Sequence, residues 1–129
     1  MRRAGILNAD LAFQLARLGH SDLVVVADCG LPQPAGVPVV DLAVVLGVPT
    51  FEQVLRAVAA ELVVEEAVVA TESLVRNPAV GELVEALFGA PGFVDHTELK
   101  RLSGRAKLLV RTGEASPYAN VVLRCGVPF

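Results

Sequence analysis

The chain has 129 residues, of which 11 are basic and 14 are acidic, so its formal net charge is −3. This length fits a single domain, residues 1–129, which would bury roughly two thirds of the surface that the unfolded chain exposes. The charged residues are scattered and form no basic block, so nucleic acid is not an expected partner.

The apolar content is high for a globular domain. Apolar residues make up 53% of the chain before its 11 glycines are counted, whereas typical usage is about 45–50% with glycine included. A membrane partner does not explain the surplus, because the longest apolar run, residues 42–49, is far shorter than the roughly 18 residues of a spanning helix. We therefore expect a homo-oligomer whose subunits bury apolar surface against one another.

The N-terminal residues and the cysteines indicate the compartment. Residues 1–7 begin like a signal peptide, but Asn8 and Asp10 interrupt the apolar stretch. Cys29 and Cys125 are too few for a disulfide framework, and a reducing compartment would keep them as thiols. We therefore expect a cytoplasmic location.

The first predicted element is a helix that begins after Asn8. Asparagine is a favoured helix cap, and apolar residues recur at helical spacing from Leu11 to Leu18. Gly19 is expected to end this helix in the left-handed conformation. His20 would then lie just past the helix end.

The next predicted element is a strand over residues 23–27. Its run of apolar residues has no polar alternation, which is typical of a strand covered on both faces in a parallel sheet. Asp28 marks its carboxyl end. The glycines and prolines of residues 30–36 predict a loop, and residues 37–42 predict a short strand in which Pro38 suits an edge position.

Two longer helices are predicted in the middle of the chain. Thr50 and Gln53 match a capping box, and an apolar stripe continues to Leu62. The next helix is expected to begin with Asn77 as its cap and Pro78 at its first helical position.

The remaining signals complete an alternation of strands and helices. Thr97 is expected to cap a short helix that ends at Leu102, and further strands are expected over residues 67–70, 93–94, 107–110 and 121–124. This order predicts an α/β fold, a single compact domain with a largely parallel sheet flanked by helices. Ligands of such sheets bind beyond the carboxyl ends of the strands.

His20 and Asp28 are the first candidates for chemistry. Histidine exchanges protons near neutral pH, and a carboxylate orients its ring. The two residues flank one predicted strand, so the pattern leaves their separation open. A structural role for His20, as a residue that follows a glycine cap and interacts with the helix dipole, also stays open.

Residues 111–120 are the second candidate region. They place hydroxyl, amide and charged side chains between two apolar runs, and such groups orient small polar ligands such as sugars. Tyr118 is the only tyrosine and the chain has no tryptophan, so no other residue offers an aromatic face with a polar tip. A solvated loop is the alternative. His96 is a ligand-binding or a surface residue by sequence alone.

No motif for a metal or a cofactor is present. The chain lacks the HxxxH, CxxC and HExxH patterns of metal sites, and it lacks glycine-rich phosphate loops. Ser116 has no GxSxG elbow and Cys29 has no cysteine-protease context, so nucleophilic catalysis is not expected. We expect neither a metal nor a cofactor.

Four blocks of residues carry a family resemblance. They are residues 5–8 (GILN), residues 18–22 with 28–32 (LGHSD and DCGLP), residues 36–43 (GVPVVDLA), and residues 111–114 with 117–120 (RTGE and PYAN). In order and spacing they resemble the D-ribose pyranase family, which is related to the L-fucose mutarotases. The resemblance covers essentially the whole chain, and residues 36–42 are closer to the pyranase branch.

The resemblance implies an isomerase that interconverts the pyranose and furanose forms of D-ribose without a cofactor. His20 matches the catalytic proton donor of the family. The residues that match substrate-binding positions are Asp28, His96, Tyr118 and Asn120, with Lys100 as a further candidate. The family forms ring-stacked decamers with sites at subunit interfaces, which agrees with the apolar surplus. Two alternatives stay open: a mutarotase acting on fucose or another sugar, and a non-catalytic sugar-binding module.

Overall fold

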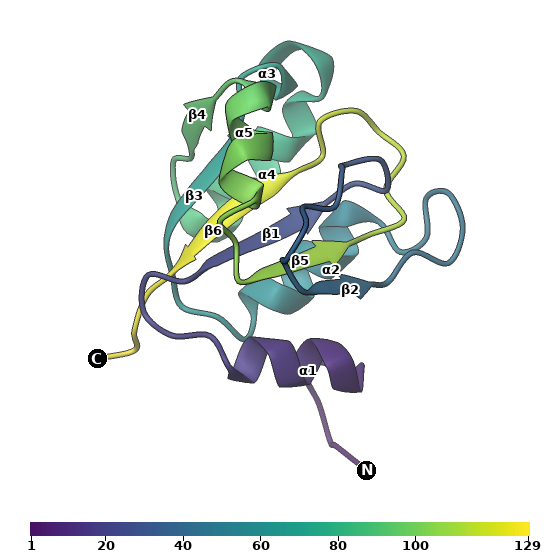
Figure 1. Ribbon diagram of the computed structural model, residues 1–129, viewed down its shortest axis with the longest axis vertical. Coiled ribbons are helices and arrows are strands. Elements are labelled where there is room, and N and C mark those ends of the chain that lie inside the picture. Colours follow the sequence, from purple (N-terminus) through teal and green to yellow (C-terminus); the bar gives the residue numbers. More distant parts are fainter.

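A six-stranded sheet with helices on both faces organises the chain (Figure 1). The computed structural model describes residues 1–129. The strands are β1 (Leu23–Ala27), β2 (Val39–Asp41), β3 (Val64–Ala70), β4 (Gly92–Val94), β5 (Leu108–Arg111) and β6 (Val121–Cys125). The helices are α1 (Ala9–Ala16), α2 (Phe51–Ala59), α3 (Ser73–Arg76), α4 (Pro78–Phe88) and α5 (His96–Ser103). Every predicted strand and helix is present, and α3 is an addition that the sequence did not predict.

The sheet is mixed, which corrects the expectation of a largely parallel one. Its strand order is β2-β5-β1-β6-β3-β4. Strand β5 is parallel to β1 and β2, and β3 is parallel to β4, but β6 is antiparallel to both of its neighbours, β1 and β3. The connection between β5 and β6 explains why β6 runs antiparallel to its neighbours. Residues 112–120, between β5 and β6, contain no helix, whereas a parallel return requires a crossover of about a dozen residues or more.

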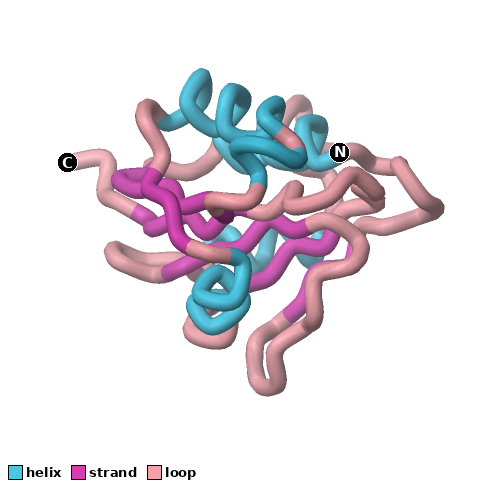
Figure 2. Tube along the Cα trace, turned by 90° about the horizontal axis from the view of Figure 1, so that it is seen from above, coloured by secondary structure: helices cyan, strands magenta, loops and turns pink.

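Each face of the sheet carries its own apolar cluster. The larger cluster has 20 buried residues, including Val24 and Val26, and packs under α1, α2 and α4. The smaller has 8 buried residues, including Val25 and Ala27, and packs under α5. Figure 2 shows helices on both sides of the layer of strands. The apolar run of β1 follows from this arrangement, because its alternating side chains enter both clusters.

Local capping signals correctly predicted where α1 and α2 begin. The Asn8 side chain accepts a hydrogen bond from the Leu11 N–H at 2.9 Å. Thr50 accepts from the Gln53 N–H at 3.1 Å, and the Gln53 side chain accepts from the Thr50 N–H at 2.9 Å, which completes the capping box. These contacts satisfy N–H groups that have no partner inside the helix.

The turn between α1 and β1 differs from the prediction. Helix α1 ends at Ala16, and the left-handed conformation occurs at Ser21 (φ 71°) and not at Gly19. The Ser21 N–H donates to the carbonyl oxygen of Cys125, the last residue of β6, at 2.8 Å. Contact with a distant strand therefore decides the shape of this turn, which carries His20.

Helix α5 begins two residues earlier than predicted. Asp95 caps it, and not Thr97, by accepting a hydrogen bond from the Glu98 N–H at 2.7 Å. Both candidates are suitable cap residues, but Asp95 directly follows β4, so the cap forms where the strand ends. His96 thereby becomes the first residue of α5.

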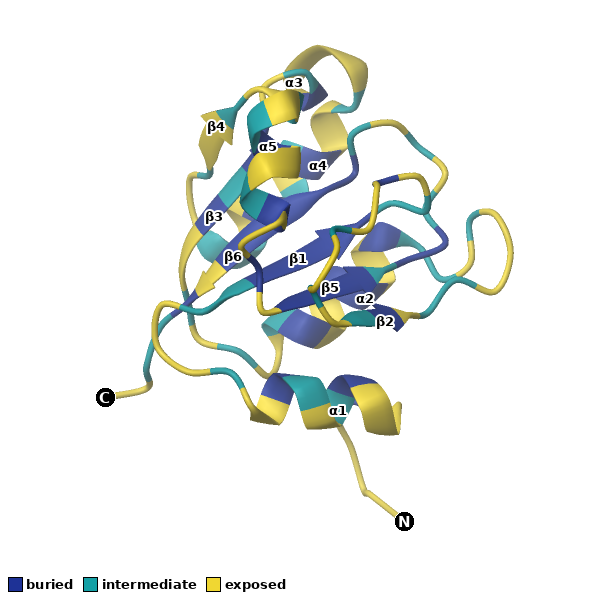
Figure 3. Ribbon diagram, in the orientation of Figure 1, coloured by how far each residue is buried: buried dark blue, intermediate teal, exposed yellow.

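Several large apolar side chains stay exposed on the surface of the chain. Figure 3 shows an exposed loop that projects beyond β2. This loop includes Val44, Val45, Leu46 and Val48, of which Leu46 is 77% exposed. None of the helices combines the length and the apolar character needed to cross a membrane. The exposed side chains are surface that an assembly of subunits would cover.

Candidate functional site

Asp28 and Asn120 hold each other at the carboxyl end of β1. The Asp28 N–H donates to Asn120 Oδ1, and Asn120 Nδ2 donates to Asp28 Oδ2, both at 2.9 Å. They meet because Asn120 directly precedes β6, whose amino end lies beside the carboxyl end of β1 in an antiparallel pair. Asn120 is fully buried, and the Gly30 N–H donates to the other Asp28 oxygen at 2.9 Å. The Asp28 carboxylate is thus a fixed hydrogen-bond acceptor.

His96 and Tyr118 form the aromatic wall of the site. Their ring centroids lie 5.0 Å apart with an interplanar angle of 86°, an edge-to-face contact. The His96 N–H donates to Glu72 Oε2 at 2.7 Å, which fixes the start of α5. The ring atom Nδ1 of His96 is buried and has no hydrogen-bond partner. Buried polar atoms are nearly always paired, so the unpaired ring nitrogen of His96 is an exception within this wall of the site.

A cavity of about 260 Å³ brings these side chains together. Its lining residues are Asp28, Gly30, Leu31, Arg76, His96, Pro117 and Tyr118. The volume is near the lower end of small-molecule sites, which run from roughly 300 Å³ upward. Donors, an acceptor and an aromatic face converge here, which is an arrangement suited to a small polyhydroxyl ligand.

Arg76 lines this cavity, although the sequence did not predict it. The helix that carries it, α3, is only four residues long, and no cap or apolar stripe predicted it. Nothing in the pattern distinguishes Arg76 from the other arginines. Arg76 reaches the cavity because α3 lies beside the loop that carries Tyr118, and only the structure shows this arrangement.

The segment after β5 supports the end of β1. Thr112 Oγ1 donates to the carbonyl oxygen of Ala27 at 2.8 Å, and the Cys29 N–H donates to that of Glu114 at 2.9 Å. The Glu114 carboxylate accepts from the Phe51 N–H at 3.0 Å. Burial raises the pKa of Glu114, but backbone and side-chain hydrogen bonds outweigh burial and bring the pKa below its usual 4.5. The ionised carboxylate therefore ties this segment to the start of α2.

His20 lies at the other end of β1, away from this cavity. Its side chain is 57% exposed, and its Nε2 lies 3.2 Å from Glu65 Oε2. Strand β1, which has 5 residues, separates His20 from Asp28, and at about 3.3 Å per residue this strand spans roughly 16 Å. The structure thus brings Asp28, His96, Tyr118 and Asn120 together but leaves His20 apart within one chain.

Lys100 also stays outside the cavity. It lies one helical turn after His96 on α5, is exposed and is not among the lining residues. Its predicted role in binding stays a prediction.

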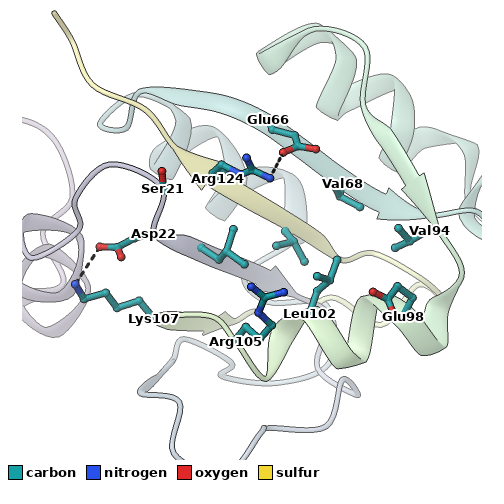
Figure 4. A pocket seen from close by; sticks show the side chains of 12 residues that line it. Ser21, Asp22, Glu66, Val68, Val94, Glu98, Leu102, Arg105, Lys107 and Arg124 are labelled. Carbon is teal, nitrogen blue, oxygen red and sulfur yellow. Dashed lines mark hydrogen bonds and ion pairs between the residues drawn. The ribbon is translucent and has the colours of Figure 1, made fainter.

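A larger cavity of about 620 Å³ lies on the α5 face of the sheet (Figure 4). Two ion pairs line it: Asp22 with Lys107 at 3.0 Å, and Glu66 with Arg124 at 2.6 Å. None of the predicted site residues lines it. Because most of its charged groups neutralise one another and no predicted residue reaches it, the smaller cavity is the candidate site. No group of three or more His, Cys, Asp or Glu side chains is placed to hold a metal ion.

Comparison with known proteins finds a family match over nearly the whole chain. A model of the RbsD / FucU transport protein family matches residues 1–128. The chain is 55% identical to D-ribose pyranase 1 of Rubrobacter xylanophilus and 55% identical to D-ribose pyranase of Streptomyces coelicolor. Each match covers 129 residues and all of both chains.

Solved structures show the same relationship. The structure of Bacillus subtilis RbsD complexed with D-ribose matches all of both chains with 42% identity and a TM-score of 0.95. The structure of FucU from Bifidobacterium longum matches 95% of this chain and 96% of its own with 20% identity and a TM-score of 0.81. The second match shows a shared fold.

Proposed function

The chain belongs to the RbsD / FucU family, and on that premise we propose that it interconverts the pyranose and furanose forms of D-ribose. The observation that carries the proposal is the full-length identity of 55% to proteins named D-ribose pyranase. The relative solved with D-ribose, at 42% identity, supports the same substrate. The proposed site is the cavity of about 260 Å³ at the carboxyl end of β1.

The reaction requires proton transfers and no redox step. Ring forms of an aldose interconvert through the open-chain aldehyde, so a proton must reach the ring oxygen while another leaves the anomeric hydroxyl. A positioned acid–base group contributes about 10²–10⁴-fold to such a step. His20 supplies this group in our proposal. Asp28 accepts hydrogen bonds from sugar hydroxyls, and His96, Tyr118 and Asn120 fix the position of the sugar and of Asp28.

His20 acts on a sugar held by a neighbouring subunit in this proposal. Strand β1, which spans roughly 16 Å, separates it from Asp28, and this is too long for both to contact one monosaccharide. The side chain of His20 is more than half exposed, so it is accessible to another copy of the chain. The site is then completed at an interface, as the resemblance to the D-ribose pyranases implied.

The exposed apolar surface supports assembly into a ring-shaped homo-oligomer, which we propose to be a decamer. Leu46 and Val75 are 77% and 84% exposed, and they lie on the loop after β2 and on α3. Burying such side chains against a second copy removes apolar surface from water, which favours association. A cytoplasmic location fits Cys29 and Cys125, which are both free thiols.

Exchange NMR on equilibrated D-ribose tests the proposed function. Wild-type protein is expected to add pyranose–furanose exchange above the rate in buffer, and His20→Ala is expected to lose it. Arg17→Ala is the matched control, because Arg17 is exposed in the same connection and lines no cavity described above. It should keep the wild-type rate.

Two outcomes would contradict the proposal and indicate another function. Exchange seen with L-fucose and absent with D-ribose would make the protein a mutarotase. Saturable binding of D-ribose without any exchange would make it a sugar-binding module.

A further inference from the structure

Arg76 has an unpaired guanidinium at the proposed sugar site. It ends α3 and lines the same cavity as Asp28 and Tyr118. Its side chain makes no hydrogen bond and no ion pair. Arg56, in contrast, pairs with Glu52 at 2.8 Å. A cation and a carboxylate thus line one small cavity without closing on each other.

The backbone that carries Arg76 is fixed against the wall of the cavity. Asn77 Nδ2 donates to Ser116 Oγ at 3.0 Å and to the carbonyl oxygen of Pro117 at 2.8 Å. At the start of α3, Ser73 is buried and its hydroxyl donates to the carbonyl oxygen of Ala70 at 2.7 Å. Both ends of this short helix are therefore anchored, and Arg76 is held beside the loop that precedes β6.

The two charged groups have complementary hydrogen-bonding capacity. Asp28 is an acceptor, and Gly30 and Asn120 already occupy one site on each of its oxygens at 2.9 Å. Arg76 is a donor with five N–H groups in a planar fork and no acceptor. A hydroxyl group both donates and accepts. Neighbouring hydroxyls of an aldose can therefore donate to Asp28 and accept from Arg76 at the same time.

We infer that Arg76 is a substrate-binding residue that donates to a hydroxyl of the bound aldose next to the hydroxyl held by Asp28. This inference rests on the proposed function. Arg76 binds a part of the sugar that does not react, so it contributes to the ground state and the transition state alike. Its removal therefore weakens substrate binding and leaves the turnover of bound substrate unchanged.

The test compares Arg76→Gln, Arg76→Lys and Arg105→Gln by the dependence of the exchange rate on D-ribose concentration. Arg76→Gln is expected to raise KM about tenfold and to leave kcat within about twofold, as for one lost charge-assisted hydrogen bond. Arg76→Lys keeps the charge but lacks the planar fork of N–H groups, so its KM should lie between those of wild type and Arg76→Gln. Arg105→Gln should match wild type, because Arg105 is an exposed arginine of the other cavity that makes no ion pair.

Each outcome decides the inference. A wild-type KM for Arg76→Gln in an active protein would overturn the role of Arg76 alone. A lower kcat at an unchanged KM would also overturn it. Absence of exchange in the wild-type protein would overturn the proposed function, and the role of Arg76 with it.

Discussion

His20 and Asp28 lie at opposite ends of β1, with His20 before the first residue of the strand and Asp28 after its last. Strand β1 is hydrogen-bonded to β5 on one side and to β6 on the other, so it does not fold back to bring its ends together. One chain therefore does not place both side chains on one monosaccharide, and in the proposed function the sugar lies between two subunits.

Mixed assemblies of His20→Ala and Asp28→Asn subunits are expected to recover exchange activity that neither variant has alone. If His20 comes from one subunit and Asp28 from its neighbour, about a quarter of the sites in an equal mixture contain both intact residues. If both act within one chain, every site lacks one of them. Co-expression with two affinity tags, tandem purification and exchange NMR on D-ribose would measure the recovered activity.

The control for this complementation is a mixture of His20→Ala with the double variant His20→Ala, Asp28→Asn. It assembles in the same way but holds no intact His20, so it should stay inactive. A first mixture that is no more active than its parents would contradict a site shared between subunits.

Asn120→Ala is expected to lower both stability and activity. The substitution removes the amide that pairs with Asp28 and leaves the part-buried Asp28 N–H without its acceptor. An unsatisfied buried group costs about 1–3 kcal/mol of the free energy of unfolding. Urea denaturation would measure this loss, and titration with D-ribose would show weaker binding because the Asp28 carboxylate is no longer fixed.

Asn8→Ala is the matched control for Asn120→Ala. It removes the cap of α1 and should cost about 1 kcal/mol, but Asn8 lies outside the cavity. Sugar affinity should stay at the wild-type value. Equal losses of affinity in both variants would mean that Asn120 acts through stability alone.

Elements with strong local signals were predicted closely. The strand over residues 23–27 coincides with β1 because a strand inside the sheet is apolar on both faces. The cap at Asn8 and the capping box at Thr50 predicted the starts of α1 and α2, since these contacts join residues three apart. The direction of β6 was not predictable in this way, because it depends on how residues 112–120 return to the sheet.

Several residues of the candidate cavity were predicted, but its geometry was not. The family resemblance placed Asp28, Tyr118 and Asn120 among the candidates, and the sheet brings them to one edge. Arg76 was missed because α3 has no local signal of its own. The distance between His20 and Asp28 was left open, since a sequence pattern does not tell how the turns at the two ends of a strand are placed.

Glu114 is expected to make stability depend on pH in the acid range. Its pKa in the folded chain lies below the usual 4.5, so its contribution to stability is complete above that pH and is lost as the pH falls through the folded pKa. The difference in the free energy of unfolding between wild type and Glu114→Gln should therefore be largest near neutral pH and shrink below pH 4.5. Urea denaturation at several pH values would measure it.

The control for Glu114 is Glu82→Gln. Glu82 is exposed on α4, and its side chain makes no hydrogen bond or ion pair. Glu82→Gln therefore shows what the loss of one exposed carboxylate, without a broken hydrogen bond, does to the free energy of unfolding. A difference for Glu114→Gln that grows on acidification would contradict the lowered pKa.

Gly113→Ala is expected to destabilise the chain, whereas Gly81→Ala is expected to stabilise it. A methyl group at Gly113 would collide with the backbone of Val45 and Val48, because the loop after β2 packs directly on this residue. Gly113 also donates from its N–H to the carbonyl oxygen of Pro49 at 2.9 Å, so the loop and the segment after β5 would have to separate. Overpacking of this kind costs about 1–3 kcal/mol.

Gly81 offers the matched comparison, since it lies inside α4 and a methyl group there would meet no atom within 4 Å. Alanine is favoured over glycine in a helix by about 0.5–1 kcal/mol. Urea denaturation of the two variants should therefore shift in opposite directions. Exchange activity should fall only in Gly113→Ala, because Thr112 and Glu114 on either side of it hold the end of β1 that carries Asp28. Wild-type stability and activity in Gly113→Ala would contradict this prediction, because they would mean that the loop after β2 moves aside at little cost and does not fix the site.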